Sequence, residues 1–231
     1  MSGTKRRGGR APVSRWKAPS PLQVATSIRA GCVRDDRVFD QYLPEDLRLA
    51  SSQFWTPLDV ALTIGSWLTE VGARKVIDIG AGTGKFCIVA SLVSDCTYFG
   101  IEHRPRLVAT ARSVARRFGV ERRVSFIEGA FGNVSIQGVD AVYLYNPFGE
   151  NLCWYDDALD ETVELGSARF RHDVALVERF LEALPVGAHL VTYSGFGGRV
   201  PDSFIEVRVE GTLPNALCMW RKDVWRRGPA A

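Results

Sequence analysis

The sequence lacks several features that would place it in a familiar class of protein. No apolar run approaches the roughly 18 residues that a membrane-spanning helix needs, and the N-terminus has no apolar core of a secretory signal. The three histidines and five cysteines show no metal-ligand spacing and no CxxC pair. We therefore expect a soluble, cytoplasmic protein with reduced cysteines, no metal site and no membrane partner.

Acidic residues are absent from the first 34 positions. Eight of the 29 Lys and Arg residues lie there, so the other 21 face all 26 Asp and Glu residues, and the remainder has a net charge of about −5. Because this stretch is also rich in Gly, Pro and Ser, we expect residues 1–34 to be a disordered basic arm. A plain solvated tail, an arm that binds nucleic acid or an acidic partner, and an organelle transit peptide are the alternatives.

The remaining chain, 35–231, is long enough for one domain with one core. We expect a helical cap over 35–70, with Thr56 as the N-cap of its last helix and Pro57 as that helix's first residue. A core over 74–224 follows. Its apolar runs predict seven strands, over 75–80, 97–102, 124–130, 138–146, 188–195, 204–210 and 215–223.

Helical patterns separate most of these strands, which is typical of right-handed βαβ units. The last two strands have no helix between them, which favours an antiparallel hairpin at the sheet edge. The predicted fold class is therefore α/β: a three-layer sandwich with a seven-stranded, mostly parallel sheet and an antiparallel C-terminal edge hairpin.

The stretch VIDIGAGTG, residues 76–84, is a buried strand that runs into a glycine-rich loop and then a helix. Such a loop lets a ligand lie against the main chain near a helix N-terminus. A Walker loop would need glycine at position 79 and Ser or Thr at 86, where the chain has Ile79 and Phe86. The dinucleotide fingerprint would need glycine at 85, where the chain has Lys85. What remains is the pattern D-x-G-x-G-x-G.

This pattern resembles the first motif of the class I S-adenosylmethionine-dependent methyltransferases. The resemblance covers residues 56–224, and Glu102 in GIEHRP stands where that family has an acid that binds the two ribose hydroxyls. The chain departs from the family at Ala130, where an acid for the adenine amine is expected. Backbone near Gly129, the Phe131 ring or Glu128 are alternatives for holding the adenine. The resemblance implies S-adenosylmethionine as cofactor, bound by Asp78, Gly80, Ala81, Gly82, Gly84, Glu102, Gly129, Ala130 and Asn146.

The fourth predicted strand ends in YLYNPFGEN, residues 143–151. Methyltransferases that act on the amino groups of nucleic-acid bases or glutamine carry Asn/Asp-Pro-Pro and then an aromatic residue at this place. Here Asn146-Pro147-Phe148 keeps the amide, one proline and the ring but lacks the second proline. The resemblance implies that Asn146 positions the acceptor amine, with Tyr145 and Glu150 as candidate proton acceptors. The residues expected to bind substrate are Phe54, Trp55, Pro147, Phe148 and Trp154.

The leading interpretation is an enzyme that methylates nitrogen by direct in-line transfer, with a protein side chain such as lysine as acceptor. A base amino-methyltransferase acting on RNA or DNA, aided by the basic arm, is the first alternative. A small-molecule methyltransferase and a non-catalytic module that binds the cofactor or a partner are the others. Either a monomer or a homodimer is compatible with the sequence.

Overall fold

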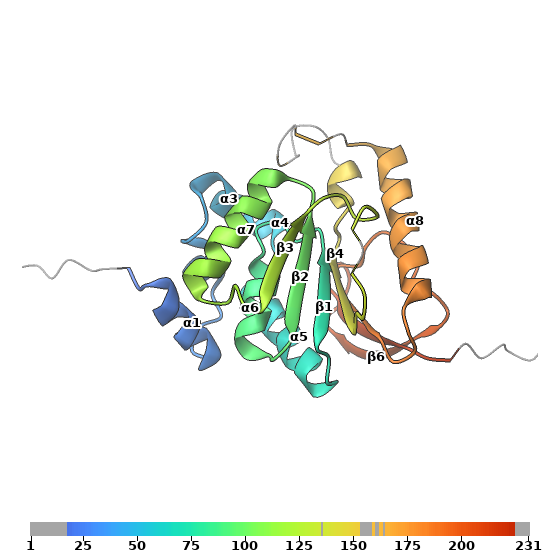
Figure 1. Cartoon of the computed structure of the whole chain (residues 1–231), viewed down its shortest axis with the longest axis horizontal. Helices are drawn as coiled ribbons and strands as arrows, with labels where there is room; N and C mark the ends of the chain where they lie inside the picture. The colour runs from blue at the N-terminus through green and yellow to red at the C-terminus, as the bar shows by residue number, and fades with distance from the viewer. Residues whose placement is uncertain (1–17, 135, 153–158, 160–161, 164, 225–231) are drawn as a thin grey trace, which may run out of the picture.

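A seven-stranded sheet with helices on both faces forms the centre of the computed structural model, which describes residues 18–134, 136–152, 159, 162–163 and 165–224 (Figure 1). The strands are β1 (Lys75–Ile79), β2 (Thr97–Glu102), β3 (Val124–Glu128), β4 (Ala141–Tyr145), β5 (His189–Tyr193), β6 (Phe204–Glu210) and β7 (Leu217–Lys222). Each lies within a predicted range or coincides with it. The predicted fold class is confirmed.

The strand order is β3-β2-β1-β4-β5-β7-β6. The first five are parallel, while β7 lies antiparallel between β5 and β6. The predicted antiparallel hairpin is therefore present, with β6 as its edge strand. The chain runs outward from β1 to β3 and then crosses to β4 on the other side of β1. Ligands of such open sheets bind where the strand order reverses, at the carboxyl ends of the strands.

The helices form two unequal layers. They are α1 (Pro21–Arg29), α2 (Asp36–Asp40), α3 (Glu45–Leu49), α4 (Ser51–Phe54), α5 (Leu58–Glu70), α6 (Lys85–Val93), α7 (Pro105–Phe118) and α8 (Ser167–Ala183), with a 3-10 turn, η1, over Gly149–Leu152. Figure 1 shows α1, α6 and α7 on one side of the sheet and α8 on the other. No helix within the described residues is long and apolar enough to cross a membrane.

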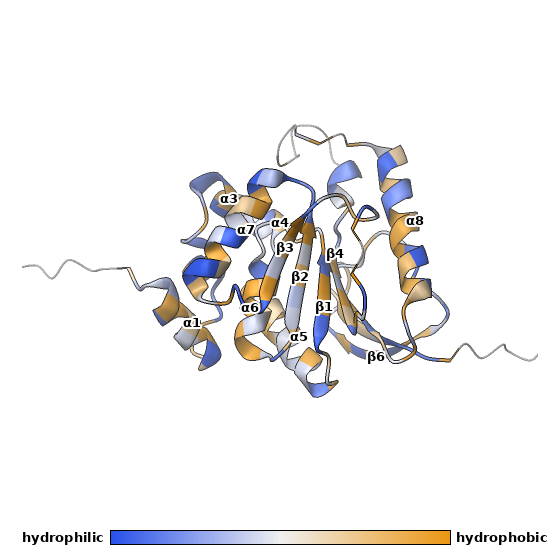
Figure 2. Cartoon of the chain, viewed as in Figure 1, coloured by the Kyte–Doolittle hydropathy of each residue, from blue (hydrophilic) through white to orange (hydrophobic). Residues whose placement is uncertain are grey.

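Hydrophobic residues form a core on each face of the sheet. Phe39, Ile64 and Phe118 belong to the core under the helices that precede β3, and Val177 and Leu181 of α8 belong to the other. Figure 2 shows hydrophobic colour along the strands and more hydrophilic colour on parts of α3, α7 and α8 that face outward. The thicker layer therefore consists of the N-terminal half of the chain, and α8 is the principal cover of the opposite face.

The predicted disorder of residues 1–34 is wrong for residues 21–29, which form α1. Val24, Ala25 and Ile28 of this helix are buried against α6 and α7. Ser20 starts the helix with a capping box: its hydroxyl accepts from the Gln23 backbone N–H, and the Gln23 side chain accepts from the Ser20 N–H. The basic, proline-containing composition concealed these local helix signals. Residues 1–17 lie outside the described residues.

The start of α5 also differs from the prediction. Pro57, not Thr56, is the N-cap, and the Thr56 hydroxyl hydrogen-bonds that of Tyr143 at 2.8 Å. The free N–H of Leu58 donates instead to Oδ1 of Asp36 in α2 at 2.8 Å. A distant carboxylate thus supplies the cap that the local sequence was expected to provide.

Lys85 ties the N-terminal helices to the glycine loop. It is the first residue of α6, and its side chain is only 1% exposed. Its ammonium forms ion pairs with Asp36 at 2.5 Å and Asp40 at 2.8 Å and donates to the Ser51 hydroxyl at 3.2 Å. Asp40 is itself buried. One buried cation therefore joins α2 and α4 to the end of the glycine loop.

Candidate active site

The glycine loop connects β1 to α6 at the carboxyl edge of the sheet. Gly80 and Gly82 have φ values of 79° and 55°, in the left-handed region that side chains disfavour. They also pack closely: a β carbon would lie 2.9 Å from Cβ of Pro147 at Gly80, and 2.5 Å from the Trp55 ring at Gly82. The loop is therefore pressed between the cap and the end of β4, with its backbone on the cavity described below.

Glu102, the last residue of β2, holds this loop in place. It is 5% exposed, and its two carboxylate oxygens accept from the backbone N–H groups of Gly82 and Arg104, each at 2.9 Å. A carboxylate offers about four acceptor positions, so two remain for a ligand. Glu102 thus has the capacity to bind a pair of hydroxyls while it fixes the loop.

Asp78, the first residue of the glycine motif, lies beneath the loop. It is 4% exposed and accepts a hydrogen bond from the Cys87 thiol at 3.3 Å. Burial and, to a smaller extent, the nearby charge of Glu102 raise the pKa of this carboxyl to about 7, although the Cys87 hydrogen bond lowers it. Asp78 is outside the cavity lining, so its contact with a cofactor stays a prediction.

A cavity of about 450 Å³ opens above the loop, within the range of roughly 300–1,000 Å³ usual for ligand pockets. Twelve of the residues predicted for the site line it: Phe54, Trp55, Gly80, Gly82, Glu102, Gly129, Ala130, Tyr145, Asn146, Pro147, Phe148 and Glu150. Asp78, Ala81 and Gly84 do not line it. Trp154 lies outside the described residues. The structure therefore brings together side chains from β1, β2, β3, β4 and the cap.

Asn146 follows β4 and has φ = 37°, a conformation that is uncommon for a residue with a side chain. Its N–H donates to the Gly195 carbonyl at 2.9 Å, which joins the ends of β4 and β5. Ser194, at the end of β5, has a left-handed φ of 57° as well. Strained backbone of this kind gathers at binding sites. The backbone of Asn146, whose side chain is exposed, is thus fixed at the cavity's rim by both strand ends.

Tyr145 and Tyr193 stand beside Asn146, with ring centroids 4.9 Å apart. Burial raises the pKa of both phenols, and for Tyr193 the charges of Asp59 and Asp36 add to the effect. Both tyrosines are therefore neutral phenols at pH 7, able to accept or donate a hydrogen bond. The sequence did not single out Tyr193, whose place beside Tyr145 follows from the pairing of β4 with β5.

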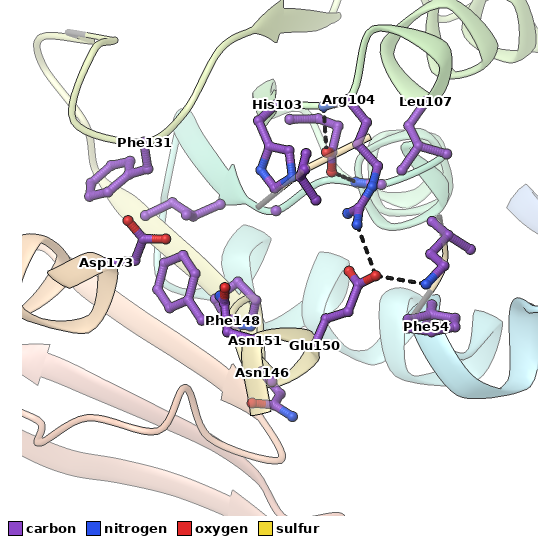
Figure 3. A pocket seen from close by; sticks show the side chains of 18 of the residues that line it. Phe54, His103, Arg104, Leu107, Phe131, Asn146, Phe148, Glu150, Asn151 and Asp173 are labelled. Atoms are coloured by element: carbon purple, nitrogen blue, oxygen red, sulfur yellow. Dashed lines mark hydrogen bonds and ion pairs between the residues drawn. The ribbon is translucent and has the colours of Figure 1, made fainter. Parts of the chain in front are cut away.

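Glu150 connects the segment after β4 to the end of β2. Its Oε1 pairs with the Arg104 guanidinium at 2.8 Å and accepts from the Leu159 N–H at 2.7 Å. Both side chains are largely buried, at 5% exposure for Arg104 and 14% for Glu150. Figure 3 shows this pair at the edge of the cavity. The role of Glu150 as a base stays a prediction.

The two aromatic residues of the cap play different parts. Trp55 is 8% exposed, and its indole N–H donates to the Leu47 carbonyl at 2.8 Å, so it packs the cap onto Gly82 while one surface lines the cavity. Phe54 is only partly buried and borders the same cavity. Of the two, Phe54 has the more accessible ring.

Phe148 points toward α8, away from Asn146. It is 8% exposed and belongs to the core on the α8 face, and Figure 3 shows its ring near Asp173. The prediction that it walls the acceptor is untested, but the ring and the Asn146 carboxamide lie on different sides of the strand end. Sequence reasoning also missed His103 and Asp173, which line the cavity. His103 follows Glu102 directly, whereas no local signal marks Asp173.

Comparison with known proteins agrees with this geometry. Residues 71–155 match the sequence profile of a family described as "Methyltransferase domain". This part of the chain is therefore similar to a methyltransferase domain. The match includes β1, the glycine loop, Glu102 and Asn146, so it covers the motifs on which the resemblance to class I methyltransferases rests. That resemblance is confirmed. No curated protein sequence matches the chain significantly.

Solved structures of methyltransferases share the fold. An RNA methyltransferase from Salinibacter ruber in complex with S-adenosyl-L-homocysteine matches with a TM-score of 0.51 and 21% identity, over 75% of this chain and 95% of that one. An O-methyltransferase from Bacillus cereus, also with S-adenosylhomocysteine, has a TM-score of 0.57 and 12% identity over 87% and 97%. A putative O-methyltransferase from Klebsiella pneumoniae has 0.56 and 11% over 87% and 96%. At these identities the likeness concerns the fold.

Proposed function

We propose that the protein is an S-adenosylmethionine-dependent N-methyltransferase whose acceptor is the amine of a protein side chain such as lysine. The observation that carries this proposal is the carboxamide of Asn146. The backbone of this residue is held in a left-handed conformation directly after β4, and the residue lines the same cavity as Gly80 and Gly82 of the glycine loop. A carboxamide oxygen at this place can orient an amine without carrying a charge.

The polar groups and the open backbone at the cavity fit the cofactor. Glu102 retains two acceptor positions for ribose hydroxyls, and Gly80 and Gly82 keep the backbone at the cavity free of side chains. Nε2 of His103, at the same cavity, is buried and has no hydrogen-bond partner among the residues that the structure describes, as expected of a group that binds a ligand. Gly129 and Ala130 complete the side formed by β3.

A cationic acceptor suits the surroundings of Asn146. Tyr145, Tyr193 and Phe54 offer aromatic surface near the rim, and aromatic faces attract ammonium groups. Asp59, exposed at the start of α5, lies close enough to raise the pKa of Tyr193. Residues 35–231 have a net charge of about −5. These features favour a basic side chain over a polyanion.

The cofactor, when bound, would supply a methyl group on a sulfonium sulfur, and the amine nitrogen would bond to that carbon in line as the carbon–sulfur bond breaks and the neutral thioether leaves. Because this displacement needs little beyond alignment, positioning of the amine supplies much of the catalysis. The Asn146 oxygen accepts one amine hydrogen and thereby directs the lone pair. An ammonium must first lose a proton, and Tyr145 and Glu150 are the proposed acceptors. Tyr145 would take the proton of the amine while it releases its own to water, and Glu150 would take the proton on a carboxylate oxygen.

Transfer of a tritiated methyl group into cell lysate tests this proposal. We expect label in protein, removed by protease and not by nuclease, and recovered as methylated lysine after acid hydrolysis. Asn146→Ala should lower the rate of transfer about 100-fold, the usual scale for a lost positioning contact, with S-adenosylhomocysteine affinity largely kept. Glu150→Gln separates the two roles of that residue, because only a base would shift the pH–rate profile. Label lost to nuclease and kept after protease would overturn the lysine assignment.

Methylation of an RNA base is the second candidate, because Asn146-Pro147-Phe148 resembles the motif of base amino-methyltransferases and one solved neighbour is an RNA methyltransferase. The position of the Phe148 ring counts against it. A ring that is 8% exposed in the core beneath α8 is not available at the rim to stack on an extruded base. The nuclease arm of the experiment above decides between the two.

A further inference from the structure

The side of the cavity next to Ala130 has no acid from β3, and α8 brings one there. The connection from β3 to β4 contains no helix among its described residues. As a result α8 packs directly on it: the Phe131 and Phe180 rings meet edge to face at 5.3 Å. A β carbon at Gly132 would lie 3.0 Å from the Leu176 side chain. This close approach puts the first turns of α8 beside Ala130.

Asp173 is the residue that α8 contributes to this side. It is 7% exposed, although buried carboxylates are rare. It lines the main cavity and also a smaller one of about 270 Å³, and Ala130 and Phe131 are common to both. One carboxylate oxygen pairs with Nε of Arg169 at 2.7 Å. A carboxylate has further acceptor positions, so this pair leaves Asp173 able to accept from a ligand.

A second polar group faces the same space. Nε2 of His103 is buried and has no hydrogen-bond partner within the described part of the chain. His103 directly follows β2, next to Gly129, which directly follows β3. Burial lowers the pKa of this imidazole, so the ring is neutral at pH 7 and can both donate and accept. Figure 3 shows Asp173, Phe131 and Phe148 gathered at one side of the cavity, with His103 facing it from above.

We propose that Asp173 accepts the hydrogen bond of the adenine amine in this chain, in place of the acid that is absent at Ala130, and that His103 is the second polar contact of the base. The inference rests on the proposed use of S-adenosylmethionine. Glu102 sets the position of the ribose, and the base then extends toward Ala130 and α8. Adenine offers an amine donor and ring-nitrogen acceptors, which match a carboxylate and a neutral imidazole. The rings of Phe131 and Phe148 provide the apolar walls.

Calorimetric titration of the full chain with two ligands tests this assignment. S-Adenosylhomocysteine carries the amine, and S-inosylhomocysteine carries a carbonyl in its place. We expect the wild type to bind the inosyl compound about 10- to 100-fold more weakly, the scale of a lost hydrogen bond to a charged group. Asp173→Asn should weaken S-adenosylhomocysteine and remove most of the preference, because an amide donates to a carbonyl. Glu178→Gln, the same change farther along α8 and outside the cavity, should leave both affinities unchanged.

The outcomes separate this inference from the function on which it rests. If the wild type binds neither ligand, the proposed cofactor is wrong and the inference fails with it. If it binds S-adenosylhomocysteine and Asp173→Asn keeps the wild-type affinity and preference, only the role of Asp173 is wrong. Circular dichroism melting checks that each variant is folded. The double variant Ala130→Asp/Asp173→Asn restores an acid from β3 and should recover the preference for adenine. A double variant with no recovery, after loss in the single variant, would indicate a purely structural role for Asp173.

Discussion

At the scale of single residues, Glu102 does two jobs with one carboxylate. It binds two backbone N–H groups of the loop edges and faces the cavity with its remaining acceptor positions. A neutral or shorter side chain loses the ligand contacts and the loop contacts together. The effect of its removal on cofactor binding should therefore be larger than that of an ordinary surface acid.

Glu102→Ala should weaken S-adenosylhomocysteine at least 100-fold, since two hydrogen bonds to a charged group contribute about 3 kcal/mol or more. Isothermal titration measures this. Glu128→Ala is the matched control: Glu128 ends the neighbouring strand β3, is exposed and lies outside the cavity lining. An equal loss in both variants would contradict the ribose assignment and return Glu128 to the list of candidates for the adenine.

Asp78 is the second residue whose chemistry depends on burial. Its pKa is raised to about 7 in the folded protein, against an ordinary value of 3.8, so the native state holds a proton that the unfolded chain releases. Stability due to this group is therefore present at acidic pH and falls as the pH rises from about 4 to 7. Cys87 and Glu102 are the groups that act on it besides burial.

Asp78→Asn should remove this pH dependence, because an amide does not titrate. As the pH rises from 5 to 8, the free energy of unfolding of the variant should increase relative to that of the wild type. Below pH 7 the increase should be at most about 1 kcal/mol per pH unit. Urea unfolding at several pH values measures it. The comparison cancels His103 and His189, whose lowered pKa values act in the opposite direction. A pH-independent difference would show that Asp78 is ionised throughout.

At the scale of elements, the helical cap is tied to the glycine loop by a buried ion pair and by one aromatic ring. Lys85 pairs with Asp36 and Asp40, and Trp55 packs its ring on Gly82. Asp36 also caps α5 through Leu58. The cap and the glycine loop therefore form one unit. A substitution of Lys85, which does not line the cavity, should still affect the candidate site through this unit.

Lys85→Met should destabilise the fold by about 3–5 kcal/mol, because it leaves the buried carboxylate of Asp40 without its cation. The control is Arg106→Gln, which breaks an exposed pair with Asp46 and should cost no more than about 1 kcal/mol. Chemical denaturation gives both values. Similar small losses in the two variants would mean that the buried pair makes no net contribution.

At the scale of the whole molecule, the boundary of the folded part lies earlier than the composition indicates. Helix α1 packs Val24, Ala25 and Ile28 into the core under α6 and α7. Removing it exposes this surface, while residues 1–17 precede every described contact. Truncation before residue 18 and truncation before residue 35 therefore distinguish the contribution of the basic arm from that of α1.

A chain that begins at residue 18 should keep the wild-type melting temperature and affinity for S-adenosylhomocysteine. A chain that begins at residue 35 should have a free energy of unfolding several kcal/mol lower than the wild type, because burying each Val or Ile side chain contributes about 1.5–3 kcal/mol of stability. Differential scanning calorimetry compares them. If the first truncation lowers methyl transfer to the natural acceptor with cofactor affinity unchanged, the arm serves the acceptor. Equal stability of both chains would contradict the role of α1.

The sequence by itself determined the architecture and predicted twelve of the residues that line the candidate site, because both depend on local signals. Apolar periodicity predicts each of the seven strands, and the spacing of Gly80, Gly82 and Glu102 predicts where the ribose and the loop meet. Asn146 is likewise marked by its place after a strand. Helix α1 is the exception. The charged, proline-containing composition of residues 1–34 indicated disorder, although the sequence of α1 begins with a capping box.

Only the tertiary structure decided what depends on elements that are distant in the chain. Asp36 caps α5, Arg104 pairs with Glu150, and Phe148 packs in the core on the α8 face. Asp173 approaches Ala130 because α8 packs on a connection whose described residues form no helix. Such pairings depend on how the helices pack on the sheet. The residues next to a helical side chain in the sequence do not indicate which distant residue it will contact.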